Sequence, residues 1–492
     1  MKKILRHALC LALASILFTA CEEWLDVAPS SQVREEEQFQ SEAGFQQALL
    51  GCYIGMTSDT LYGQALSWYL PDLLSQTYNT FSSSGNNYGF YFQRYSYNST
   101  HSHRMVEAIW ERAYNVIANT NNVLKFVEKN KSVLHSINYT LIKGELLAIR
   151  AYMHFELLRL YGYGDLAHRA DKATRLTIPY VTGTSKEVTE QPTYSEAITN
   201  IVNDLKAAIA LLELDPITGA HPADFYAMVN TDGFYDHRTS RLNYYAAKAL
   251  LARVYLWEGG EASLEQARSL AMELIEMNEA RGVFSWVVDN MDVSLGLSVE
   301  CLFSLNHSRL AEKVFDYFLP DFKNTDYGML YIKESNLMQM YEVAAGGGVD
   351  TRYSKWYHVD LAGNALPVKI GSTQAVPTHV SMIRLSELYY IAAEGYGAGA
   401  APDYGKAKQL IRAVREKRGL NADFTCNDAA SLHAELRKEY VKEFVAEGVL
   451  FYFYKRTGEE VIVNSVGTAI EMDDAKYLFP YPDFEIQSGR VQ

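Results

Sequence analysis

Apolar residues recur at helical spacing over most of the chain, and three segments repeat one pattern. They are GELLAIRAYMHFELLRLYG at Gly144–Gly162, LNYYAAKALLARVYLWEG at Leu242–Gly259 and MIRLSELYYIAAEGYG at Met382–Gly397. In the second segment, Leu242, Tyr245 and Ala249 fall on one stripe of a helix. Each segment closes with an aromatic residue at or near a glycine, so the pattern predicts three similar buried helices.

Each of these helices is followed by a second amphipathic segment, at Tyr194–Leu212, Ser263–Met277 and Asp403–Arg418. The spacing between the two members of a pair is close to that of tetratricopeptide repeats. We therefore expect a mostly α fold, a scaffold of tetratricopeptide-like helical hairpins at 144–212, 242–277 and 382–418, with long loops inserted in a single domain. Helical hairpins without repeat ancestry are the alternative interpretation.

Between the helices the chain becomes polar and aromatic, at 67–99, 182–192, 214–240 and 283–374. Loops this long in a compact domain are usually functional or disordered. Their content of Tyr, Phe and Trp argues against disorder. We expect the segments 67–99 and 283–374 to be ligand-binding loops.

The N-terminus has the form of a secretion signal. Basic Lys2, Lys3 and Arg6 precede an apolar run that is too short for a permanent membrane span. The run closes at Cys21 in the manner of a lipoprotein signal, so residues 1–20 are expected to be removed, Cys21 lipidated and residues 21–492 anchored by the acyl chains. Simple cleavage with an unmodified Cys21 is the alternative. The later Cys52, Cys301 and Cys426 are too few and too widely spaced for a disulfide framework.

Composition narrows the function. The net charge of −14 argues against nucleic-acid binding. The chain contains 35 tyrosines, a residue whose flat apolar face and hydroxyl suit wet recognition surfaces.

Motifs for catalysis are missing from the sequence: it has no nucleophile elbow, phosphate loop or zinc-protease motif. His101 and His103 could both reach a metal ion, but without further ligands a surface pair is the preferred interpretation. We expect no enzyme activity, metal or cofactor.

The best candidate for a recognition surface is SSSGNNYGFYFQRYSYNS at 82–99. Rigid rings stack on sugar faces while small polar groups adapt to hydroxyls. The candidate contacts are the rings of this segment, its polar side chains and three tryptophans in or beside loops: Tyr88, Phe90, Tyr91, Asn86, Asn87, Arg94, Trp68, Trp286 and Trp356. A half-buried strand or hairpin, with its tyrosines packed on helices, is the alternative.

Blocks along nearly the whole mature chain resemble the SusD/RagB family of Bacteroidetes surface lipoproteins. The opening CEEWLDVAP, the Gly144–Gly162 helix, Arg241–Leu256, Ile383–Glu394, Glu439–Gly448 and the closing Phe479–Ile486 occur in the family's order. The family also has a polar Ser-Asp near its first binding loop, and Asp72 is the nearest counterpart.

The resemblance implies a helical fold with tetratricopeptide-like units and ligand loops on one face. It also implies a glycan-binding lipoprotein on the outer face of the outer membrane, which delivers oligosaccharide to a SusC-like TonB-dependent transporter without chemistry of its own. An oligopeptide or other nutrient as ligand, a surface glycan hydrolase and a repeat adaptor without ligand stay open as alternatives.

Overall fold

The structure is a computed structural model that describes residues 36–79, 81, 87–185, 187–219, 229–287, 297–319, 328–372 and 376–492. Its longer helices are α3 (Glu42–Met56), α6 (Thr100–Lys129), α7 (Ser136–Tyr161), α8 (Tyr194–Leu211), α10 (Tyr244–Glu258), α11 (Glu261–Arg281), α13 (Leu310–Phe318), α16 (Leu385–Tyr396), α17 (Tyr404–Lys417), α18 (Ala429–Glu443) and α19 (Leu450–Thr457). The shorter ones are α4 (Leu70–Leu74), α5 (Gly89–Phe92), α14 (Glu334–Met340), α15 (Thr351–Lys355), α20 (Asp474–Tyr477) and α21 (Asp483–Gln487). The fold is therefore mostly α, as the sequence predicts.

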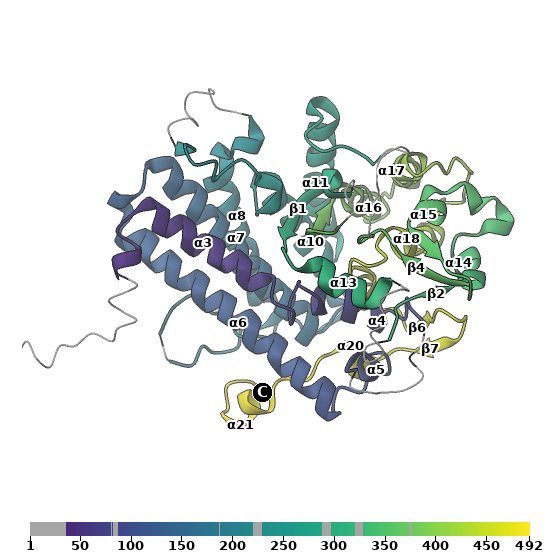
Figure 1. Ribbon diagram of the computed structural model, residues 1–492, viewed down its shortest axis with the longest axis horizontal. Helices are drawn as coiled ribbons and strands as arrows, with labels where there is room; N and C mark the ends of the chain where they lie inside the picture. Colours follow the sequence, from purple (N-terminus) through teal and green to yellow (C-terminus); the bar gives the residue numbers. More distant parts are fainter. Residues whose placement is uncertain are drawn as a thin grey trace, which may run out of the picture.

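The three predicted hairpins are present, as α7 with α8, α10 with α11 and α16 with α17. They form one continuous stack, because α8 also contacts α10 and α11 also contacts α16. Helices α3 and α6 extend the stack at the N-terminal end, and α18 packs on α17 at the other end (Figure 1). This nearest-neighbour packing is typical of repeat scaffolds.

Small residues allow these helices to approach closely. A β-carbon added to Gly395 of α16 would lie 2.5 Å from the β-carbon of Arg268 on α11. The early alanines of the second helices, Ala197, Ala267 and Ala407, are fully buried. The alanine and glycine positions that mark the repeats in the sequence are thus the contact points between helices.

Side-chain caps fix where several helices begin. Thr193 accepts the backbone N–H of Glu196 at 3.3 Å, and the Glu196 carboxylate accepts the backbone N–H of Thr193 at 2.8 Å, which forms a capping box at the start of α8. Asn243 and Asp403 accept N–H groups of the first turns of α10 and α17. These caps define the residue at which each helix begins after its loop.

Strands occupy part of the segments expected to be loops. β1 (Cys301–Asn306) pairs with β5 (His379–Arg384), β4 (Asn364–Pro367) lies between β2 (Ile332–Lys333) and β3 (Tyr357–Val359), and β6 (Val461–Val463) pairs with β7 (Ala469–Glu471), all antiparallel. Two expectations are corrected. The segment 283–374 contains β1–β4, α13, α14 and α15, and the segment 67–99 contains α4 and α5. The helix expected from Met382 begins at Leu385, because Met382–Arg384 belong to β5.

Buried ion pairs join the C-terminal half of the molecule. Glu443 of α18 accepts hydrogen bonds from Arg384, Arg418 and Arg352 at 2.6–3.1 Å. Glu300 accepts from Arg384 and Arg418 at 2.8–2.9 Å. All five side chains are almost fully buried. Ion pairs as well as apolar packing therefore connect β5 and α18 with the segments beside β1 and α17.

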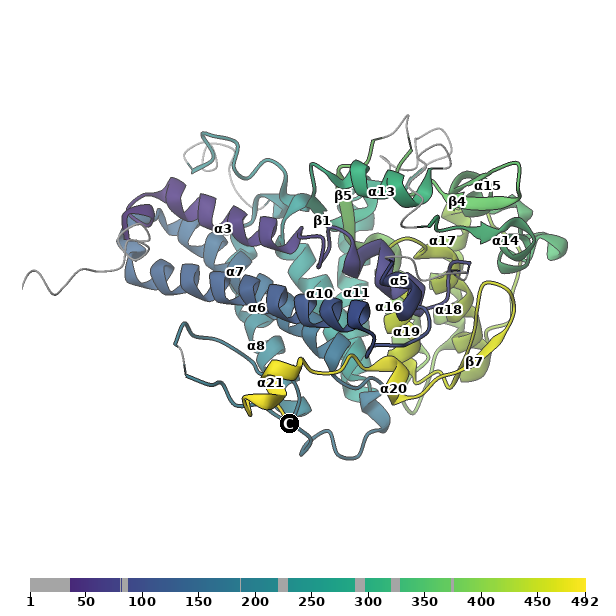
Figure 2. The same ribbon diagram turned by 60° about the horizontal axis from the view of Figure 1, so that its bottom comes forward.

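The C-terminal segment runs from α20, which lies below α19 in the view of Figure 2, back along the helical end of the molecule to α21, which lies below α6 and α8. The indole N–H of Trp110 on α6 donates to Glu485 of α21 at 3.3 Å. Within the described residues, no helix combines the length and apolar character that a membrane span requires. Cys52, Cys301 and Cys426 are buried free thiols.

Candidate functional site

Trp68, predicted to be an exposed ring beside the platform, is completely buried. It lies in the π-helical turn Ala65–Tyr69, all of whose residues are buried. Its ring packs edge-on against Tyr317 and Phe318, with centroids 5.4 and 5.5 Å away. The expectation of an exposed ring is wrong, because this segment is helical and belongs to the core.

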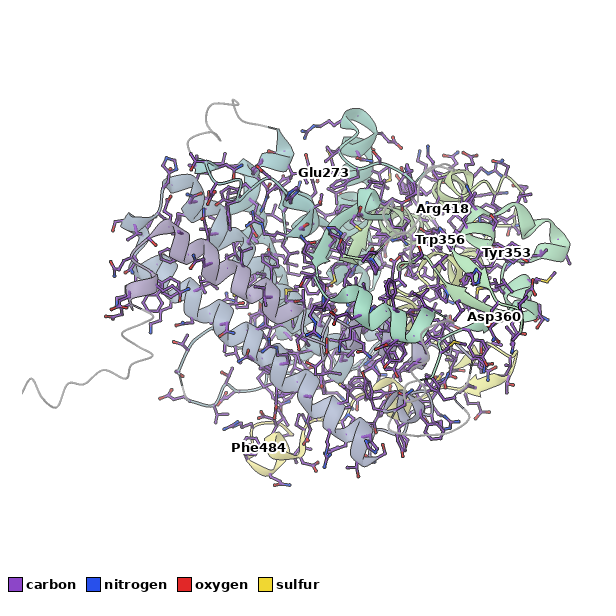
Figure 3. All side chains as sticks on the ribbon, viewed as in Figure 1. Glu273, Tyr353, Trp356, Asp360, Arg418 and Phe484 are labelled. Atoms are coloured by element: carbon purple, nitrogen blue, oxygen red, sulfur yellow. The ribbon has the colours of Figure 1, made fainter. Side chains whose placement is uncertain are left out.

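Trp356 is also buried, in the C-terminal half together with Arg418 (Figure 3). The ammonium of Lys369 lies 4.4 Å from its ring centroid, and the guanidinium of Arg418 lies 5.3 Å from it. Trp286 is half-buried and packs on Tyr389, again with Arg418 at 5.3 Å. The two tryptophans thus flank one buried arginine, and the expected exposure of Trp356 is wrong.

Asp72 and Asn87, predicted as ligand contacts, have internal partners. Asp72 accepts hydrogen bonds from the Tyr78 hydroxyl and the Gly448 backbone N–H, both at 3.0 Å. Burial raises the pKa of Asp72 to about 8, so this carboxyl is mostly protonated at neutral pH. Asn87 accepts from the Tyr69 hydroxyl and from the N–H of Gly89 at the start of α5. Both side chains are buried, and a ligand role for either stays a prediction.

The remaining residues of the expected platform lie on or beside α5. Tyr88, Phe90 and Tyr91 are half-buried and Arg94 is exposed. The Arg94 guanidinium covers the Phe90 ring at 3.6 Å, and Tyr91 stacks on His101 with centroids 5.8 Å apart. Residues 87–99, the described part of the segment, contain the helical turn α5 and no strand, so the strand or hairpin of the alternative is wrong. Its packed tyrosines are present, because Tyr88 and Tyr95 pack against the core.

Two of the predicted residues, Asn86 and Cys21, lie outside the described residues. A ligand role for the partly exposed rings of α5 stays a prediction.

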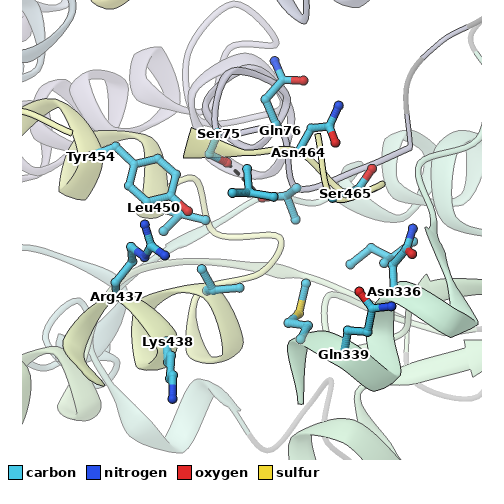
Figure 4. Close-up of a pocket in the computed structure, with 16 residues that line it drawn as sticks. Ser75, Gln76, Asn336, Gln339, Arg437, Lys438, Leu450, Tyr454, Asn464 and Ser465 are labelled. Atoms are coloured by element: carbon cyan, nitrogen blue, oxygen red, sulfur yellow. Dashed lines mark hydrogen bonds between the residues drawn. The ribbon is translucent and has the colours of Figure 1, made fainter. Parts of the chain in front are cut away.

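A pocket of about 360 Å³ lies where the two predicted ligand segments meet. One wall is formed by Ser75–Thr77, which follow α4, and another by α14 of the later insertion. Helices α18 and α19 and the turn of the β6–β7 hairpin complete it (Figure 4). Its lining residues are Ser75, Gln76, Thr77, Ile332, Asn336, Gln339, Met340, Arg437, Lys438, Val441, Leu450, Tyr454, Val463, Asn464, Ser465 and Gly467.

Backbone contacts hold the walls together. The N–H of Ser465 donates to the carbonyl of Gln76 at 3.1 Å, and the Ser465 hydroxyl donates to the carbonyl of Tyr78 at 3.0 Å. Gln76 adopts a left-handed backbone with φ 61°, which a residue with a side chain rarely does. Its side-chain amide donates to the carbonyl of Gln93 and to the Tyr95 hydroxyl. The first loop is therefore fixed to the hairpin turn before any ligand arrives.

The pocket offers polar groups that have no protein partner. Within the described residues, the side-chain amides of Asn336 and Gln339 make no hydrogen bond, and both lie on the wall opposite Arg437 and Tyr454 (Figure 4). Burial raises the pKa of the Tyr454 phenol, which keeps it neutral. Leu450, Val441 and Met340 supply apolar surface between these groups. Such a mixture of flat apolar area and convergent polar groups is typical of ligand sites.

The described lining of this pocket differs from that of a glycoside hydrolase site. Glycoside hydrolysis needs two carboxylates on either side of the bond that is cleaved. No Asp or Glu is among the described residues that line this pocket. The amides, the two cations and the apolar side chains of this lining suit the binding of a polar ligand.

A second groove, of about 530 Å³, is lined largely by tyrosines near α20 and the C-terminus. Its rings are already engaged by the protein. The hydroxyls of Tyr97 and Tyr161 donate to the carbonyls of Lys476 and Val106, and the ring of Tyr163 is covered by Arg169 and Arg175. It is therefore a weaker candidate than the first pocket.

The two histidines singled out in the sequence have different surroundings. His101 stacks on Tyr91, whereas the Nε2 atom of His103 lies 3.4 Å from Glu107 and 3.3 Å from Asp483. These three side chains lie close enough to share a metal ion. The sequence could not show this, because Asp483 comes from α21 at the other end of the chain.

Several pocket residues were missed by sequence reasoning. Asn336 and Gln339 fall within the predicted segment 283–374, but Arg437, Tyr454 and Asn464 lie beyond it. No local signal marks Arg437, because a polar residue on an amphipathic helix is the ordinary pattern of a solvated face.

Comparison with known proteins supports the resemblance. Residues 23–256 match a SusD-like family profile described as "Starch-binding associating with outer membrane". A segment of 154 residues, 29% of this chain, is 27% identical to the SusD-like protein P25 of Formosa agariphila, and it spans only 28% of that protein's length.

Solved structures share the fold over nearly the whole chain. A SusD superfamily protein from Bacteroides thetaiotaomicron matches with a TM-score of 0.70 and 21% identity over 92% of this chain and 99% of its own. A SusD-like carbohydrate binding protein from Bacteroides vulgatus matches with a TM-score of 0.69 and 15% identity over 91% of this chain and 96% of its own.

Proposed function

From the SusD-like profile over residues 23–256 and the shared fold, we propose that the chain is a SusD-like, non-catalytic binding protein for oligosaccharides, which captures a glycan and delivers it to a SusC-like TonB-dependent transporter. The observation that carries the proposal is the pocket between α14, α18, α19 and the β6–β7 turn, with its unpaired amides and no lining carboxylate among the described residues. The family's description as starch-binding and associated with the outer membrane supports the ligand class and the location.

Sugars fit the chemistry of this pocket. A pyranose has a face of C–H bonds, which packs on the apolar side chains of Leu450 and Met340, and a rim of hydroxyls that need polar partners. Asn336 and Gln339 each carry an amide, which can donate to one hydroxyl and accept from another. The amide oxygen of Asn464 already accepts the backbone N–H groups of Val466 and Thr468, so this residue offers its N–H₂ group to a hydroxyl. Each such bond contributes about 0.5–1.5 kcal/mol after water is displaced, so affinity is modest and the ligand can leave again.

Location follows from the proposed anchor. With Cys21 acylated, the protein is held on the outer membrane and faces the exterior, where it covers the transporter barrel and closes on it once an oligomer is bound. The energy for import comes from TonB, so this chain makes and breaks no bond.

The experiment is calorimetric titration of the purified protein with a panel of neutral and acidic oligosaccharides. Gln339→Ala should weaken binding of whichever oligomer binds by about 2- to 12-fold, the equivalent of one lost hydrogen bond. Gln266→Ala, at an exposed amide on α11, is the matched control and should bind normally. If no oligomer of the panel binds, or if pure protein shortens one, the proposed function is wrong.

A further inference from the structure

The charged residues that line the pocket are all cationic. Arg437 and Lys438 are its only charged residues in the described lining, although the chain as a whole carries a net charge of −14. In an acidic protein, a recognition pocket that presents cations and no carboxylates is informative about the ligand, because a random lining would be acidic more often than basic.

The two cations differ in how far they are neutralised. The ammonium of Lys438 lies 2.8 Å from Glu342 and 3.1 Å from Glu435. Burial tends to raise the pKa of Glu342, but contacts with Lys438 and Lys442 lower this pKa to about 2. The Glu342 carboxylate is therefore ionised and fully engaged with the two lysines. The charge of Lys438 is therefore largely neutralised by these carboxylates, and this residue contributes little to the binding of a charged ligand.

Arg437 is different, because its guanidinium makes no hydrogen bond to any described residue. Its one ion pair within that part of the chain, with Glu459, is 3.6 Å long, and the same carboxylate also contacts His433. None of the five N–H donors of this side chain is used in a hydrogen bond to a described residue, and 43% of the side chain is exposed. In Figure 4 the guanidinium lies beside Leu450 and Tyr454 at one wall of the pocket.

We propose that the pocket selects anionic oligosaccharides, with Arg437 as the residue that holds the carboxylate or sulfate of the sugar; this rests on the proposed function. The planar guanidinium matches both groups in two-pronged geometry, which a lysine ammonium cannot do. Neutral amides of Asn336, Gln339 and Asn464 hold the hydroxyls of the same sugar, and no carboxylate in the described lining repels its charge.

The negative net charge of the protein does not strongly oppose the binding of an anionic oligosaccharide. At physiological ionic strength, charges farther apart than about 8 Å are largely screened. Binding of the anionic group is therefore governed by the local pair with Arg437, and its affinity should fall as salt is raised. A neutral oligomer should show no such dependence.

The test compares three probes by calorimetry: hexagalacturonate for the carboxylate, a sulfated galactan hexamer for the sulfate ester and an uncharged galactan hexamer. The acidic probe that fits should bind at least tenfold more tightly than the uncharged one. Arg437→Gln should abolish this preference, and Arg437→Lys should keep only part of it, since the charge remains but the fork is lost. Lys417→Gln removes the same charge from an exposed position outside the pocket and should leave the preference intact.

A second variant works in the opposite direction. Glu459→Gln removes the carboxylate that competes for Arg437, so it should tighten binding of the acidic probe. Thermal melts of every variant confirm that the fold is kept. Equal or tighter binding of the uncharged hexamer, unaffected by Arg437→Gln, overturns the inference but leaves the proposed function standing. If a wider panel also fails to bind, the proposed function itself fails, and the inference with it.

Discussion

Replacing Glu443 by Gln tests whether the buried charges hold the C-terminal half together. The Glu443 carboxylate is fully buried and accepts four hydrogen bonds, one from Arg384 at 2.8 Å, two from Arg418 at 2.6 and 3.1 Å, and one from Arg352 at 3.1 Å. Burial alone would raise the pKa of Glu443, but the three guanidinium groups outweigh it and hold that pKa well below its usual range.

The expected cost follows from what the substitution leaves behind. A glutamine side chain at this position would keep the shape but present one amide N–H₂ to arginine donors, and three buried guanidinium groups would lose a shared negative charge. Each arginine keeps another carboxylate, because Glu300 contacts Arg384 and Arg418, and Glu439 contacts Arg352. Removing one partner of a buried ion pair typically costs about 3–5 kcal/mol, which is a large part of the total stability of about 5–15 kcal/mol for a folded domain.

The measurement is urea unfolding of wild type and Glu443→Gln, followed by fluorescence across pH. Since the folded pKa of Glu443 lies below the usual 4.5, its contribution is complete above about pH 4.5 and is lost as the pH falls toward the folded value. The difference between the two proteins should therefore be full at neutral pH and shrink in acid. Glu416→Gln, at an exposed position of α17, is the control and should change the free energy of unfolding by no more than about 0.5 kcal/mol. Equal urea midpoints for Glu443→Gln and wild type at neutral pH would refute the reasoning.

Three further predictions concern residues singled out in the sequence. Because burial raises the pKa of Asp72 from the ordinary 3.8 to about 8, its contribution to stability is complete below about pH 4 and is lost as the pH rises to about 8. The stability of Asp72→Asn relative to wild type should therefore increase in melts from about pH 4 to about pH 8 and level off above that, and a constant difference across pH would contradict this. Trp68→Ala should lower the free energy of unfolding by about 3–5 kcal/mol, whereas Phe90→Ala, at a half-exposed ring, should cost about 1 kcal/mol or less in the same denaturation assay. Equal costs would mean that burial does not separate the two rings. Cys21→Ala should release the folded protein from the outer-membrane fraction and abolish palmitate labelling, and continued membrane association would refute the lipid anchor.

The helical scaffold was determined largely by local sequence. Three helix pairs were predicted at nearly their observed positions, because buried stripes, early alanines and terminal glycines depend on neighbours a few residues away. Those stripes survive in the structure as the faces that pack α7 on α8, α10 on α11 and α16 on α17. The order of family motifs along the chain also indicated which fold the helices form, and the solved structures share that fold.

Exposure in the inserted segments was decided by the tertiary structure. Trp68 and Trp356 are aromatic residues in segments that look like binding loops, yet the core covers both. The pocket joins Ser75, Gln339, Arg437 and Asn464, which are far apart in the sequence. Each of them lies in a local pattern with an ordinary interpretation, so the sequence alone could indicate helices and loops but not which loops meet. The packing of α14, α18 and the β6–β7 turn around one pocket determines which loops meet, because burial and proximity depend on contacts between distant parts of the chain.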